Sequence, residues 1–92
     1  MNNIHTFENH SQAVDILTKY YVKHEGFKIK IPNTNKNEVF RIRNKETCIM
    51  IILKDDLTIM KKRKYGHLIG MMTTEEYEEA KKYLEDMKAL TY

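Results

Sequence analysis

The spacing of hydrophobic and polar positions predicts a helix near the N-terminus. Over residues 10–25, apolar or aromatic side chains recur every three or four residues, as on one face of an amphipathic helix. These positions are Ala13, Val14, Leu17, Tyr20, Tyr21 and His24. Asn9 or Ser11 is suited to cap the start of this helix, and Gly26 supplies the left-handed residue that commonly ends one.

The middle of the chain changes to the two-residue period of β-strands. Residues 27–31 and 40–43 alternate between apolar and basic side chains, which predicts two strands with one apolar and one basic face each. Residues 47–53 are apolar at every position after the first, a pattern typical of a central strand covered on both faces. We expect a fourth strand over residues 57–63 and a short fifth strand over residues 67–71.

Short connections between these segments determine how the strands run. Asn44-Lys45 and Asp55-Asp56 suit two-residue hairpin turns, because Asn and Asp tolerate positive φ. Residues 32–37 contain the single proline and three asparagines and are expected to form a mobile loop. Parallel strands need a long crossover, so these strands are expected to be antiparallel.

The C-terminal segment returns to a helical pattern. Thr73 and Glu76 have the spacing of a capping box, and glutamates in the first turns complement the positive end of the helix dipole. The expected inward stripe consists of Tyr77, Ala80, Leu84, Met87 and Leu90. The whole order predicts the α+β class: a four- to five-stranded antiparallel meander sheet flanked by an N-terminal and a C-terminal helix.

Length and composition narrow the class of protein. The 92 residues (11.0 kDa) are enough for a single domain spanning 1–92. With 41% hydrophobic and 32% charged residues, the composition is that of a soluble globular protein. The longest apolar run, residues 48–53, is far shorter than the roughly 20 residues of a membrane span. The first residues have no secretory pattern, so we expect a cytoplasmic protein with no membrane partner.

Residues able to carry out catalysis or hold a metal are few and scattered. Cys48 is the only cysteine and stands in the most apolar segment, so we expect it to be buried and unreactive. His10 and His24 would stand roughly 20 Å apart on one helix. The four histidines therefore lack a complete ligand set. Neither a phosphate-binding glycine loop nor a nucleophile elbow is present. We expect no enzyme activity of a known motif class, no metal and no cofactor.

Charge segregation is the most informative functional feature. Residues 27–64 contain eleven Lys or Arg against four Asp or Glu, whereas the flanking segments are net acidic. The expected binding residues are Lys28, Lys30, Arg41 and Arg43 on a basic sheet face, the cluster Lys61, Lys62, Arg63 and Lys64 on its rim, and Tyr65 as a stacking side chain. Such a region is suited to binding a polyanion. An equally simple explanation is a solvated face that keeps the protein soluble and protects the sheet edges.

Four hypotheses for function follow from these observations. The first is a small non-enzymatic binding or inhibitory protein that occupies the surface of a protein or nucleoprotein partner. In size, lack of motifs and segregated charge, the chain is similar to small inhibitors encoded by phages and mobile elements, including anti-CRISPR proteins; the likeness is one of profile alone. The alternative is a nucleic-acid-binding regulator that uses the basic sheet face or rim. An enzyme with an unrecognised site and a self-complementary homodimer complete the set.

Overall fold

The computed structural model describes residues 3–33 and 37–90, without the side chains of Lys64, Ala89 and Leu90. The chain begins with helix α1 (His10–Ile16), which continues as a π-helical segment η1 (Leu17–Val22). Five strands follow: β1 (Lys28–Lys30), β2 (Glu38–Asn44), β3 (Ile49–Lys54), β4 (Ile59–Arg63) and β5 (Leu68–Met71). A 3-10 turn η3 (Lys64–Gly66) joins β4 to β5, and helix α2 (Thr74–Leu90) ends the described chain.

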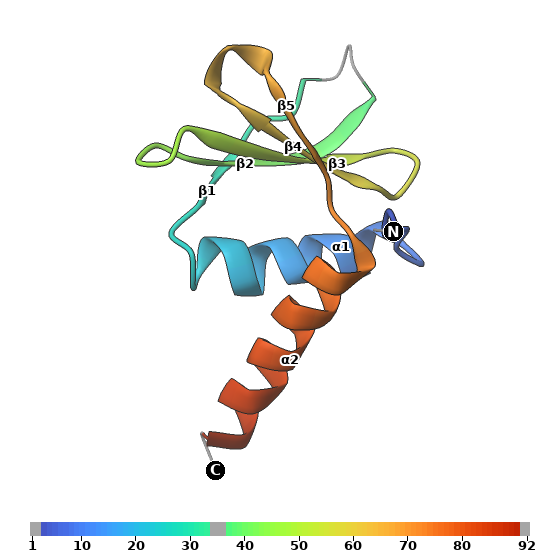
Figure 1. Ribbon diagram of the computed structural model, residues 1–92, viewed down its shortest axis with the longest axis vertical. Helices are drawn as coiled ribbons and strands as arrows, with labels where there is room; N and C mark the ends of the chain where they lie inside the picture. Colours follow the sequence, from blue (N-terminus) through green and yellow to red (C-terminus); the bar gives the residue numbers. More distant parts are fainter. Residues whose placement is uncertain (1–2, 34–36, 91–92) are drawn as a thin grey trace.

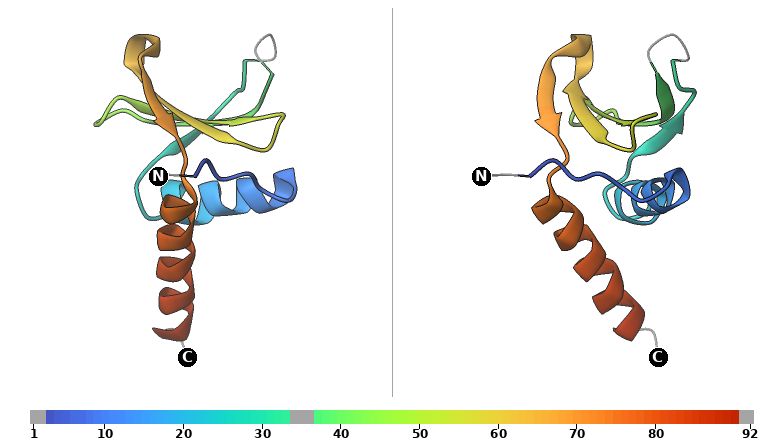
Figure 2. Two further views of the ribbon diagram at one scale, coloured as in Figure 1. Left: turned by 45° about the vertical axis from the view of Figure 1, so that its right-hand side comes forward. Right: turned by 90° about the vertical axis from the view of Figure 1, so that its right-hand side faces the viewer.

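The strands form one antiparallel meander sheet in the order β1-β2-β3-β4-β5 (Figure 1). The predicted fold class and topology are therefore confirmed, including the short fifth strand. Both helices lie on one side of the sheet, and the opposite side carries no helix (Figure 1). Figure 2 shows that the sheet curls, so that its outer strands bend away from the helices. The sheet therefore has one face that the helices cover and one face that no helix covers.

The N-terminal helix begins where the sequence predicts. The Asn9 side chain accepts a hydrogen bond of 2.8 Å from the backbone N–H of Gln12 and so caps the first turn. After Ile16 the helix widens to the π form, and the Thr18 hydroxyl donates to the Val14 carbonyl (2.9 Å). Such a side-chain bond competes with the regular helical ladder and often bends helices. Gly26, with φ 81°, follows the helix in the left-handed conformation.

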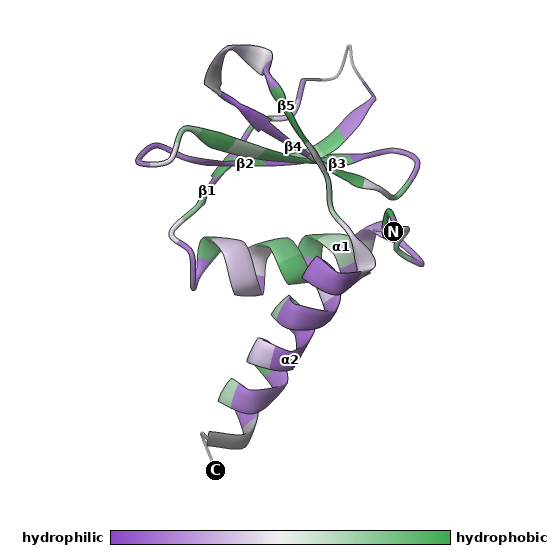
Figure 3. Ribbon diagram, in the orientation of Figure 1, coloured by the Kyte–Doolittle hydropathy of each residue, from purple (hydrophilic) through white to green (hydrophobic). Residues whose placement is uncertain are grey.

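Helix α2 is held at its start and runs away from the sheet at its end. The Glu76 N–H donates to Thr73 Oγ1 and the Thr73 N–H donates to Glu76 Oε1, each at 3.2 Å, which is the predicted capping box. Ala80 is buried, but Met87 is 44% exposed. The inward stripe therefore packs on the core from Tyr77 to Leu84, whereas Met87 beyond it does not. The outer turns are mostly hydrophilic (Figure 3).

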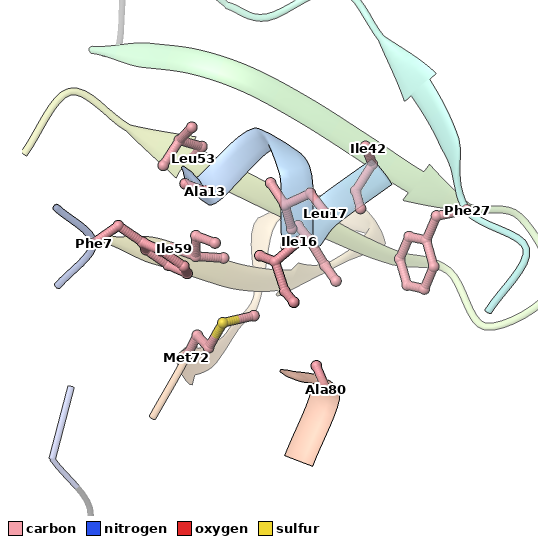
Figure 4. Close-up of a cluster of buried hydrophobic side chains, with 11 residues drawn as sticks. Phe7, Ala13, Ile16, Leu17, Phe27, Ile42, Leu53, Ile59, Met72 and Ala80 are labelled. Carbon is pink, nitrogen blue, oxygen red and sulfur yellow. The ribbon is translucent and has the colours of Figure 1, made fainter. Parts of the chain in front are cut away.

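The hydrophobic core fills the space between the helices and one face of the sheet (Figure 4). Its buried members are Phe7, Ala13, Ile16, Leu17, Phe27, Ile42, Ile51, Leu53, Ile59, Met72 and Ala80. Three of the five strands and both helices contribute to this set. The N-terminal segment closes one end of the core, since the Phe7 N–H donates to the Leu57 carbonyl at 2.9 Å.

The apolar and basic faces predicted for residues 27–31 are present in β1, since Ile29 pairs with Ile42 whereas Lys28 and Lys30 pair with arginines, but the apolar face is little buried. Phe27 is buried, but Ile29 is 56% and Ile31 91% exposed. β1 is an edge strand of only three residues, so its apolar side chains have a neighbouring strand on one side only.

Cys48 is exposed, which contradicts the prediction that it is buried. The two-residue turn expected at Asn44-Lys45 is a longer loop, since β2 ends at Asn44 and β3 begins only at Ile49. The Asn44 side chain accepts hydrogen bonds from the N–H groups of Glu46 (2.9 Å) and Thr47 (3.3 Å), which stabilises this longer loop. Cys48 lies at its end with φ 60°, outside the strand.

The turn expected at Asp55-Asp56 is longer in the same way. β3 ends at Lys54 and β4 begins at Ile59, and Leu57 between them has φ 70°. The Asp56 carboxylate accepts hydrogen bonds from the Thr58 N–H and hydroxyl, which lower the pKa of Asp56. These contacts give Asp56 a structural role in the turn.

Candidate interaction surface

The strand register places ten side chains on the side of the sheet that carries no helix. Directly paired residues of neighbouring antiparallel strands point to the same side, so each row of partners shares one face. One row consists of Lys28, Arg43, Met50, Lys62 and Leu68, and the next of Lys30, Arg41, Ile52, Met60 and Met71. We call these ten residues the helix-free face. The predicted basic sheet face lies within it.

The helix-free face has a basic part and an apolar part. All four of its residues from β1 and β2 are cationic, whereas five of its six residues from β3, β4 and β5 are apolar. Lys28 and Lys30 are exposed, Lys62 is half-buried, and Leu68 is 62% exposed. The sequence interpretation identified the cations but overlooked the methionines between them. The two-residue period of a β-strand, applied to residues 49–54 and 59–62, could have placed Met50 and Met60 on the face opposite the core.

Ile52 is fully buried although no helix lies above it. Its neighbours in the row are Arg41 on one side and Met60 on the other. Because the sheet curls toward this side, long side chains of adjoining strands can close over a central residue. The helix-free face thus has a small apolar layer of its own, separate from the main core.

Arg41 belongs to this face but is already paired. Its Nη2 donates to Glu38 Oε1 at 2.7 Å and its Nε donates to Glu38 Oε2 at 3.0 Å, a bidentate ion pair. The Asn33 N–H donates to the same carboxylate at 3.0 Å. Burial alone would raise the pKa of Glu38, but these hydrogen bonds outweigh burial and hold that pKa below its usual range. Arg41 therefore stabilises the face, and its charge is neutralised within the chain.

The basic cluster predicted over residues 61–64 is divided between the two faces. Lys61 pairs with Ile51 in the register, so it points toward the helices, where it forms an ion pair with Glu76 of α2. Lys62 points to the helix-free face, and Arg63 shares the other face with Ile49. The Lys64 side chain lies outside the described part of the chain. Consecutive residues of a strand face opposite ways, and for this reason the prediction of one continuous rim is wrong.

A small cavity of about 190 Å³ adjoins the basic part of the helix-free face. It is lined by Glu25, Gly26, Lys28, Lys30, Arg43, Asn44, Lys45 and Glu46. Four cationic side chains against two carboxylates favour an anionic group at this end of the sheet.

Tyr65 stands at the tip of the β4–β5 hairpin and is 86% exposed. Its φ of 74° and the φ of 82° at Gly66 build the tight reversal. A bulky residue in the left-handed region costs roughly 1–2 kcal/mol. Two of its neighbours along the hairpin, Lys62 and Leu68, belong to the helix-free face.

The histidines that contact α2 have structural roles. The His5 ring stacks on Tyr77 with 4.1 Å between centroids, and Tyr83 Oη lies 2.9 Å from His24 Nδ1. Burial lowers the pKa of His5, and Glu78 partly opposes this effect. Within residues 3–33 and 37–90, no three His, Cys, Asp or Glu side chains are grouped closely enough to hold a metal ion.

Comparison with known protein families, with curated proteins and with solved structures found no match to this chain. Among the helices that the structure describes, none has the length and hydrophobicity needed to cross a membrane.

Proposed function

We propose that this protein is a non-enzymatic binding protein that attaches to an acidic surface of a protein or nucleoprotein partner through the helix-free face. The observation that carries this proposal is the direct adjacency of exposed cations and a methionine-rich apolar layer on one side of the sheet. Methionine and arginine are enriched at protein interfaces, and methionine side chains adapt to the shape of a partner.

The two parts of the face would contribute differently to binding. Lys28, Lys30 and Lys62 would draw an acidic partner to the face and orient it, since charged surfaces mainly govern association rate and specificity. Leu68 and the methionines would supply the area from which water is removed, where most interface energy is concentrated. The Glu38–Arg41 pair lies within β2, and because each charge neutralises the other it would not compete for the partner's carboxylates.

Inhibition by occupancy is the mode of action that we propose for such a chain. A small protein that covers part of a larger machine can block it without any chemistry of its own. This would make the protein comparable in action to phage-encoded inhibitors such as anti-CRISPR proteins.

The test is affinity purification of the tagged protein from its native cells, with and without nuclease digestion. The wild type is compared with the double variant Lys30→Glu/Lys62→Glu, whose changes both lie on the helix-free face. Arg63→Glu is the matched control, because it reverses a charge next to Lys62 on the opposite face. We expect a partner that resists nuclease, is lost from the double variant and is retained by the control. Equal recovery by all three proteins, or recovery of no partner, would refute the proposal.

A nucleic-acid-binding regulator is the second candidate, favoured by the cation-lined cavity and by the exposed Tyr65. Binding to phosphates would weaken with salt, with a log–log slope of roughly −0.7 to −0.9 per phosphate contact. On the first proposal, isolated duplex DNA binds only weakly and without sequence preference, at roughly 10⁻⁴ to 10⁻⁶ M at physiological salt. Tight, sequence-selective binding to naked nucleic acid would favour the second candidate.

A further inference from the structure

A second surface lies between the two helices, on the other side of the sheet from the helix-free face. Helix α2 runs obliquely away from α1 and η1 (Figure 1), and the two helices leave a groove of about 750 Å³ between them. It is lined by Gln12, Asp15, Ile16, Lys19 and Lys23 from the first helical segment and its end, and by Tyr77, Lys81, Leu84, Glu85, Met87 and Lys88 from α2. We propose that this groove binds an acidic amphipathic helix of another protein.

The floor of the groove is an apolar stripe that extends along α2 beyond the end of the hydrophobic core. Ile16 is buried, Leu84 packs partly against the core, and Met87 is 44% exposed at the open end. An amphipathic helix normally buries its apolar stripe against another element. Here the last part of the stripe projects beyond the body of the protein, so a further helix laid in the groove would cover it.

The sides of the groove determine the charge of its occupant. Lys19 and Lys23 stand on one side and Lys81 and Lys88 on the other, against the two carboxylates of Asp15 and Glu85. Asp15 forms an ion pair with Lys19 at 3.1 Å, so these two charges offset each other. A lining with four lysines against two carboxylates around an apolar floor complements a helix with an apolar stripe flanked by carboxylates, the helix-in-groove mode of recognition.

The experiment uses the full chain and a synthetic peptide as the probe. The peptide is a helix of about 16 residues with leucines along one face and glutamates on both sides of that face, long enough to form a helix. A control peptide has the same composition in an order that gives no apolar stripe. Binding is followed by the NMR methyl signals of the methionines, because Met87 lies in the groove whereas Met50 and Met60 lie on the helix-free face.

Two variants test the charge argument. Lys23→Glu/Lys81→Glu reverses one exposed lysine on each side of the groove. Lys82→Glu is the matched control, since Lys82 is exposed on α2 but does not line the groove. We expect the Met87 signal to shift saturably with the striped peptide, and the double reversal to weaken binding by roughly tenfold or more. We expect Lys82→Glu to bind as the wild type does.

Several results would overturn the inference. They are an unchanged Met87 signal, equal binding of the control peptide, shifts confined to Met50 and Met60, or equal loss in Lys82→Glu. Circular dichroism of each variant checks that the helices are retained. Because the readout is local to the groove, failure here leaves the proposal for the helix-free face untouched, and the reverse also holds.

Discussion

The two faces of the sheet are made from alternate residues of the same strands, yet they differ in how they are covered. On the face beneath the helices, branched side chains such as Ile42, Ile51 and Leu53 are at most 1% exposed. Of the ten residues of the helix-free face only Ile52 is buried, and its neighbours in the register are a cation and a methionine. The first face is stabilised by close packing, whereas the second combines limited packing with groups able to bind a partner.

A residue can therefore be buried without a second layer of secondary structure above it. Ile52 lies on the concave side of the curled sheet (Figure 2), between the long side chains of Arg41 and Met60 in the neighbouring strands. Flexible side chains also rearrange more easily than branched ones, so a face covered in this way can adapt to a partner. Stability and binding can therefore be assigned to opposite sides of one strand.

The largest expected effect separates Ile51 from its neighbour Ile52. Ile51→Ala should lower the free energy of unfolding by about 2–5 kcal/mol, because it leaves a cavity among rigid core side chains. Ile52→Ala should cost less, about 2 kcal/mol, since the long side chains around it can collapse into the space. Urea denaturation of both variants gives the two values. Equal losses would contradict the difference in packing between the two faces.

Glu38→Gln should have the next largest effect. It removes the charge that pairs with Arg41 in a site where the Glu38 side chain is only 3% exposed. We expect a loss of about 1–3 kcal/mol at neutral pH.

The same variant should change the pH dependence of stability. The pKa of Glu38 is lower in the folded than in the unfolded chain, so the unfolded chain takes up the proton first as the pH falls. Its contribution is complete above the ordinary value of 4.5 and is lost as the pH falls through the folded pKa. Denaturation at several pH values should show a shallower acid limb in Glu38→Gln than in the wild type. Parallel acid limbs would contradict this role of the ion pair.

Adjacent lysines on β4 provide a third comparison. Lys61→Met removes the ion pair to Glu76, a residue that also caps α2, and should cost about 0.5–1 kcal/mol. Lys62→Met should change stability by less than about 0.5 kcal/mol. In binding to the recovered partner we expect the opposite order: Lys62→Met should weaken binding more than Lys61→Met does. Thermal denaturation and a binding titration of the same two variants check both halves.

Cys48→Ser should have the smallest effect on stability, below about 0.5 kcal/mol, because the side chain is exposed in a loop. For the same reason, native wild-type protein should react with a thiol reagent as quickly as denatured protein does. Slow labelling of the native protein would show that the thiol is covered.

Much of the fold could be predicted from the sequence because its signals are local. The capping box at Thr73, the helical period over residues 10–25 and the alternation over residues 40–43 each depend on neighbouring residues alone. Alternation also placed Lys28, Lys30, Arg41 and Arg43 on one face, as the register confirms.

The errors arose where a local sequence pattern is compatible with more than one arrangement of the backbone or of the side chains. The loop at Cys48 is lengthened by hydrogen bonds to the Asn44 side chain, which the apolar run after it concealed. The partner of Arg41 depends on the register shift between Glu38 and Phe40. The two-residue period of a strand places Lys61 and Lys62 on opposite faces of the sheet. The prediction instead treated residues 61–64 as one cluster because four cationic residues follow one another.

The most direct test of the helix-free face is a methyl NMR titration with the recovered partner. Met50, Met60 and Met71 lie on that face, whereas the neighbouring Met72 is fully buried in the core beneath the helices. We predict that the first three signals shift or broaden as the partner is added, while the Met72 signal stays in place. Binding that leaves Met50, Met60 and Met71 unchanged would contradict the account.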